Sequence, residues 1–177
     1  GGTFDRLVSQ GHEVHVVYQT SGNIAVSDQD ALKYLEVTSD LIEEKSNPQL
    51  EILKKAFLET NPNHPANRSI CDLKGSIRKR ESLGATRYFA VPDKQVHFMN
   101  LPFYETGMIA KNPISQKDID LTVAMIEKIK PHQIYAAGDL ADPHGTHRVC
   151  LDVIFAALKI LKPKPYMEDC WVWLYRG

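Results

Sequence analysis

The spacing of apolar residues changes period repeatedly along the chain, and this change predicts strands and helices in turn. Short runs dominated by valine, isoleucine and aromatic residues predict strands, whereas apolar residues recurring every three or four positions predict helices. The expected strands are residues 13–19, 96–101, 133–137 and 170–175. The expected helices are residues 3–10, 28–45, 50–59, 73–86, 116–130 and 149–161.

Two of the expected helices begin at a Ser-x-x-Asp sequence. Ser27 with Asp30, and Ser115 with Asp118, have the spacing of a capping box at a helix start. Strands that alternate with helices are typical of a mostly parallel sheet covered by helices on both faces. We therefore predict an α/β fold and a single domain over residues 1–177. Because the chain opens with a helix, the strand expected before that helix is missing.

The composition excludes several classes of protein. The chain has 21 Lys plus Arg against 22 Asp plus Glu, a balance that gives no reason to expect nucleic acid or an anionic membrane as a partner. No apolar run reaches the roughly 20 residues of a membrane span. The three cysteines lie far apart, which favours a reducing, cytoplasmic compartment. The chain has no initiator methionine, and we interpret it as a piece of a longer protein.

The segment from Asp142 to Arg148 contains the strongest candidate chemistry. It joins the strand at 133–137 to the helix at 149–161, and ligands of open α/β sheets bind at the carboxyl ends of strands. We expect His144 and His147 to point into one cleft there. Imidazole is a good zinc ligand, but a catalytic zinc site needs three protein ligands. The alternative is that one histidine packs locally while the other is solvated, and that Asp142 only initiates a turn.

A second candidate is the pair Arg78 and Glu81, which lie three residues apart on one expected helix and therefore face the same way. They can clamp a substrate hydroxyl or phosphate. The alternative is a solvated face, since the surrounding residues form a charge run.

Other residues have weaker signals. We expect one of Trp171 and Trp173 to be buried and the other exposed. The remaining histidines have no partner at ligand spacing, and we interpret them as structural or solvated: His12, His15, His64, His97 and His132.

In combination, the motifs resemble the family of de-N-acetylases that act on N-acetylglucosamine linkages, the PIG-L or LmbE-like group. The resemblance covers nearly the whole chain. The matching pieces follow the family's order along the sequence: Gly1-Gly2-Thr3-Phe4-Asp5-Arg6-Leu7, Gly11-His12-Glu13-Val14, Thr20-Ser21-Gly22, then Arg78, Glu81 and Ala85, and finally His144 and His147.

The resemblance implies a Rossmann-like fold and a zinc ion. It makes His147 a metal ligand and His144 a residue that stabilises the charged tetrahedral intermediate. It further implies that Asp142 orients His144 and that Arg78 contacts the substrate. We assign Glu81 and Asn23 to substrate binding as well; Asn23 stands where the family often has a glutamate.

Three features depart from the family pattern. The His-Pro-Asp-Asp-Glu segment, which supplies two metal ligands and a catalytic carboxylate, is not in this chain. The usual His-Pro-Asp-His is replaced by residues 144–147, and residues 27–59 look like an insertion. We therefore expect this chain by itself to be inactive and to bind zinc poorly.

The resemblance is strongest to a domain that follows a glucosamine-6-phosphate deaminase (isomerase) domain in larger proteins of Bacteroides-like bacteria. The expected function is zinc-dependent removal of acetyl from a small-molecule N-acetylamino sugar. The alternative is a non-catalytic sugar-binding or regulatory domain of an amino-sugar-phosphate deaminase. A homo-oligomer is a further expectation, because a neighbouring copy can pair with an exposed sheet edge.

Overall fold

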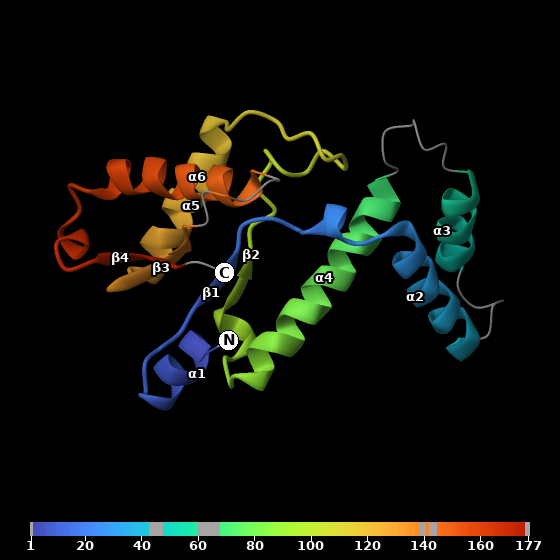
Figure 1. Cartoon of the computed structure of the whole chain (residues 1–177), viewed down its shortest axis with the longest axis horizontal. Helices are drawn as coiled ribbons and strands as arrows, with labels where there is room; N and C mark the ends of the chain where they lie inside the picture. The colour runs from blue at the N-terminus through green and yellow to red at the C-terminus, as the bar shows by residue number, and fades with distance from the viewer. Residues whose placement is uncertain (1, 43–47, 60–67, 139–140, 142–144, 176–177) are drawn as a thin grey trace. The chain divides into compact units, whose positions relative to one another are not determined.

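A computed structural model describes residues 2–42, 48–59, 68–138, 141 and 145–175 of the chain (Figure 1). Clustering of contacts divides the chain into two compact units. The N-terminal unit comprises residues 1–98 and 107–110, and the C-terminal unit comprises residues 99–106 and 111–177. Each unit is described by itself.

The N-terminal unit combines a short parallel sheet with helices. Strands β1 (Val16–Tyr18) and β2 (Val96–Phe98) pair in parallel, with Val16 opposite Val96. The other elements of this unit are α1 (Gly2–Ser9), η1 (Asn23–Ala25), α2 (Asp28–Leu41), α3 (Pro48–Glu59), α4 (Arg68–Tyr88) and η3 (Asp93–Gln95).

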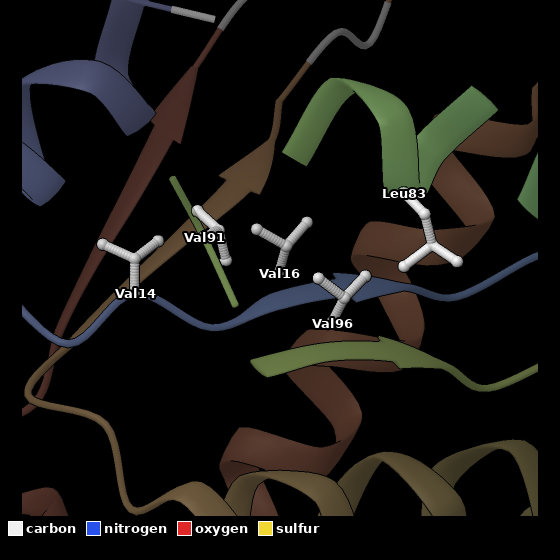
Figure 2. Packing of buried hydrophobic residues seen from close by; sticks show 5 residues of the cluster. All are labelled: Val14, Val16, Leu83, Val91 and Val96. Carbon is white, nitrogen blue, oxygen red and sulfur yellow. The ribbon is translucent and has the colours of Figure 1, made fainter. Parts of the chain in front are cut away.

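One hydrophobic cluster joins this sheet to α4. Its buried members are Val14, Val16, Leu83, Val91 and Val96 (Figure 2). Val14 and Val16 are two residues apart on an extended segment and therefore share a face. Burying a valine or leucine contributes about 1.5–3 kcal/mol, so this cluster is a main source of stability for the unit. It also holds β1, and the turn that follows it, beside α4.

A second cluster attaches the elements that follow β1 to α4. Val26, Ala31 and Ile77 are buried together, which packs η1 and α2 against the middle of α4. Asp28, in the first turn of α2, forms an ion pair with Lys74 of α4, with 2.6 Å between Oδ1 and Nζ. The Lys74 side chain is only 16% exposed whereas that of Asp28 is 72% exposed, so solvent still screens the pair from the Asp28 side.

The C-terminal unit has the order helix, strand, helix, strand. Its elements are α5 (Gln116–Ile129), β3 (Gln133–Ala137), α6 (Thr146–Leu161), η4 (Pro165–Met167) and β4 (Trp171–Tyr175). β3 and β4 pair in parallel, with Tyr135 opposite Trp173. The core of this unit is formed by Ile126 of α5 with Ala157 and Leu161 of α6.

The predicted α/β class is confirmed: within the described residues the chain combines helices with short parallel strands. The strands near residues 16 and 96 are shorter than predicted, and α4 extends beyond 73–86 at both ends.

The expectation for the two tryptophans was wrong. Trp171 and Trp173 are both exposed, at 67% and 51%, because residues two apart on a strand point to the same face. None of the described helices is both long and apolar enough to span a membrane.

Candidate functional site

The turn that follows β1 depends on glycine. Gly22 has φ +68, a left-handed conformation that glycine adopts at little cost, and it caps the short helix η1. Its carbonyl accepts a hydrogen bond from the Ala25 N–H at 3.0 Å. The Asn23 N–H donates to Ser21 Oγ at 3.4 Å. These contacts fix the backbone direction where the chain leaves the carboxyl end of β1.

This turn lies directly against α4. A Cβ added to Gly22 would lie 3.3 Å from Arg78 Nε, and one added to Gly75 would lie 3.5 Å from Ser21 Cβ. Asn23 is 3% exposed at this contact. A Cβ at Gly75 would make only ordinary van der Waals contacts, so the packing itself does not require glycine at this position of α4.

Arg78 and Glu81 form an ion pair on α4, on the shared helix face that their spacing predicted. Both side chains are about half exposed, at 45% and 46%. The guanidinium lies along the Gly22 turn, so the turn restricts its position. The pair presents hydrogen-bond donors and acceptors to the same stretch of solvent.

A groove borders this ion pair, and we call it the α2–α4 groove. Its lining comes from α2, from the segment around η1, and from α4: Ala25, Val26, Asp30, Lys33, Tyr34, Val37, Ile77, Arg78 and Glu81. Within it Lys33 Nζ lies 3.2 Å from Asp30 Oδ1. The sequence analysis assigned no role to the residues of α2 that line this groove, although their spacing along one helix face was a usable signal.

His147 lies on a helix and not in the preceding loop, because α6 begins at Thr146, three residues before the predicted helix start. It lies in the first turn of α6, with Gly145 as the N-cap at φ +68, after the loop that follows β3. Its side chain is exposed. Asp142 and His144, the other predicted members of this segment, lie outside the described residues.

The described residues do not form a metal site by themselves. No group of three or more histidine, cysteine, aspartate or glutamate side chains with suitable geometry occurs in the described part of the chain. Of the metal ligands that the sequence analysis named, His147 is described, and a single imidazole does not complete a zinc coordination sphere. We therefore assign no catalytic step to a metal.

The structure also reveals a histidine pair that sequence reasoning missed. His15 Nδ1 lies 3.0 Å from His97 Nε2, with the rings 5° from parallel, and His15 Nε2 lies 3.2 Å from Glu13 Oε1. The spacing of the two histidines in the sequence gave no sign of this pairing, and the contact agrees with a structural role, one of the two alternatives predicted for these histidines. Val17 pairs with His97, so His15, two residues earlier, shares the face of His97. One ring must donate and the other accept, so this bond requires a neutral imidazole.

The chain matches the family profile described as GlcNAc-PI de-N-acetylase (PIG-L) over residues 1–158. This match contains the Gly22 turn, the Arg78–Glu81 pair and His147. The chain belongs to the PIG-L family. The match therefore covers the whole N-terminal unit and most of α6.

A curated relative extends the comparison. The chain is 44% identical over 186 residues to a glucosamine-6-phosphate deaminase-like protein of Bacteroides thetaiotaomicron. The alignment covers 100% of this chain and 28% of that protein, so the chain spans little more than a quarter of its relative's length. No solved structure matches the chain significantly.

Proposed function

We propose that this chain is part of a hydrolase domain that removes the acetyl group from an N-acetylamino sugar, with zinc as its metal. The observation that carries this proposal is membership of the PIG-L family over residues 1–158. In the net reaction a water oxygen bonds to the acetyl carbon and the C–N bond breaks. The sugar nitrogen gains a proton, and the products are acetate and a free amino sugar.

The proposal gives separate roles to the residues of the two units. In the N-terminal unit Arg78 and Glu81 bind sugar hydroxyls, and the turn containing Asn23 positions Arg78. In the C-terminal unit His147 is one metal ligand, while His144 stabilises the oxyanion and Asp142 orients His144. The half-exposed ion pair beside a rigid turn supports the first assignment, and the position of His147 at a strand-to-helix junction supports the second.

The finer architecture is part of the same proposal. We infer a single Rossmann-like domain with helices on both faces of a parallel sheet, attached to a deaminase or isomerase domain. The structure has two separate two-stranded sheets, β1 with β2 and β3 with β4, and what supports the proposal is that both are parallel. The name of the Bacteroides relative, a glucosamine-6-phosphate deaminase-like protein, supports the attachment.

The test uses the full-length protein that contains this chain, with N-acetylglucosamine compounds as substrates. His147→Ala should lower acetate release by at least about 100-fold and reduce bound zinc measured by elemental analysis. His132→Ala is the matched control, because His132 is an exposed histidine outside the 142–148 segment, and it should keep both activity and zinc.

Unchanged acetate release and zinc content in His147→Ala would contradict the hydrolase assignment. If the unaltered protein releases no acetate but still binds the sugar, the domain is a non-catalytic sugar-binding domain instead.

A further inference from the structure

One face of α2 lines the α2–α4 groove and has no role in the core. Asp30, Lys33, Tyr34 and Val37 follow the spacing i, i+3, i+4, i+7, which places them on a single helix face. The core-facing stripe of α2 is a different one, containing the buried Ala31 and Leu35. Tyr34 is 51% exposed although it is a large aromatic side chain. This helix face therefore has both the position and the chemistry of a binding surface.

We propose that the α2–α4 groove binds the pyranose ring of the sugar, with Tyr34 stacking on the ring and the paired charges contacting its hydroxyls. This inference rests on the proposed function and adds to it the residues of α2 that recognise the substrate.

The apolar part of the groove suits a sugar ring. Val26 and Ile77, each 7% exposed, contribute buried apolar side chains to its lining, and Tyr34 adds an aromatic face. A pyranose has C–H groups on its faces and hydroxyls around its edge. It can therefore cover apolar and aromatic surface while its hydroxyls remain hydrogen-bonded to polar groups at the rim.

The charges of the groove favour a neutral ligand. Two cations, Arg78 and Lys33, are each paired with a carboxylate in the same groove, Glu81 and Asp30 respectively. Hydrogen bonds from Ser27 and then Lys33 hold the pKa of Asp30 below its ordinary value, so Asp30 stays ionised near neutral pH. With its cations already neutralised, the groove has no surplus positive charge for a phosphate. The paired groups keep N–H donors and oxygen acceptors for hydroxyls.

The position of α2 is fixed well enough to shape the groove. Lys74 of α4 binds Asp28 at 2.6 Å in the first turn of α2, and Ala31 is buried against Ile77 one turn later. Tyr34 lies less than one helical turn after Ala31, so the same contacts position its side chain.

The experiment measures the dissociation constant of N-acetylglucosamine for the full-length protein by titration calorimetry or ligand-observed NMR. Tyr34→Ala should weaken binding about tenfold, and Tyr34→Phe should keep it, because the ring and not the hydroxyl makes the contact. Tyr88→Ala is the matched control: Tyr88 is an 84% exposed tyrosine that does not line the groove, and its loss should leave affinity unchanged. Equal melting temperatures show that each variant is folded.

A second arm tests the charge argument with N-acetylglucosamine 6-phosphate. Its affinity should lie within about threefold of that of the neutral sugar and should change little with salt. Tenfold tighter, salt-sensitive binding of the phosphate compound would overturn the proposal, as would unchanged affinity of Tyr34→Ala for the neutral sugar.

The outcomes separate this inference from the proposed function. If His147→Ala stops acetate release while Tyr34→Ala leaves both affinity and KM unchanged, the groove assignment falls and the hydrolase assignment stands. If Tyr34→Ala weakens sugar binding in a protein that releases no acetate, the groove assignment stands and the hydrolase assignment falls.

Discussion

The two Ser-x-x-Asp helix starts share one sequence pattern but differ in what they stabilise. At the start of α2, Ser27 Oγ accepts the Asp30 N–H at 3.0 Å, and the Asp30 carboxylate, 57% exposed, binds Ser27 Oγ and Lys33. At the start of α5, Asp118 is completely buried. Its carboxylate accepts from the Ser115 N–H at 2.8 Å, from Ser115 Oγ at 2.5 Å, and from the distant Phe103 N–H at 3.0 Å.

The difference shows that one local motif can have a local or a tertiary function. Asp30 caps a helix in solvent and remains accessible to the groove. Asp118 caps a helix and also anchors a segment fifteen residues earlier, where Phe103 is fully buried. We therefore expect the two aspartates to respond very differently to mutation and to acid.

The largest effect should come from removing the buried carboxylate. Asp118→Ala leaves the N–H groups of Phe103 and Ser115 without their acceptor, and unsatisfied buried donors are costly. We expect a loss of about 3 kcal/mol in the free energy of unfolding, measured by urea titration. Hydrogen exchange at the Phe103 amide should accelerate at the same time. Exchange as slow as in the unaltered chain would show that Asp118 does not anchor this segment.

Acid should remove the stability that the Asp118 carboxylate contributes. Burial alone raises the pKa of Asp118, but hydrogen bonds from the Ser115 side chain and from the Phe103 and Ser115 backbone outweigh it and lower the pKa. A lowered pKa in the folded state gives stability that is present above the unfolded value of about 3.9 and is lost as pH falls below it. The unaltered chain should therefore have a higher urea midpoint than Asp118→Asn at pH 6.5, and this gap should narrow near pH 3. A gap between them that stays constant with pH is the contrary result.

The two capping serines provide an intermediate and directly matched test. Ser115→Ala should destabilise by about 1 kcal/mol and Ser27→Ala by about 0.5 kcal/mol, both within the range for N-cap removal. The larger value belongs to Ser115 because its hydroxyl binds a buried carboxylate. Thermal unfolding of both variants measures the difference, and equal losses would mean that burial does not distinguish the two caps.

The smallest effect should come from the exposed aspartate. Asp30→Asn keeps a side-chain oxygen near Ser27 and loses only a solvent-screened interaction with Lys33. We expect no resolvable shift in melting temperature. A shift as large as that of Asp118→Asn would remove the distinction between the two motifs.

Much of the local structure could be predicted from the sequence because its causes lie within one or two helical turns. Apolar periodicity located the helices, Ser-x-x-Asp spacing located two of their starts, and the i, i+3 spacing of Arg78 and Glu81 predicted their shared face. The position of His147 at a strand-to-helix junction followed from the order of elements. Glycine was a poorer guide to the end of a helix, since α4 continues through both Gly75 and Gly84 to Tyr88.

By itself, the sequence determined the order of elements, the capping motifs and the family of this protein, because each depends on residue types at short, regular spacing. Only the tertiary structure decided which distant residues meet. His15 and His97 are 82 residues apart and touch because β1 pairs with β2 in one register. Tyr34 lines a groove because α2 is held on α4, and Asp118 is buried because Phe103 lies beside it. Such contacts depend on packing between elements, which no local pattern encodes.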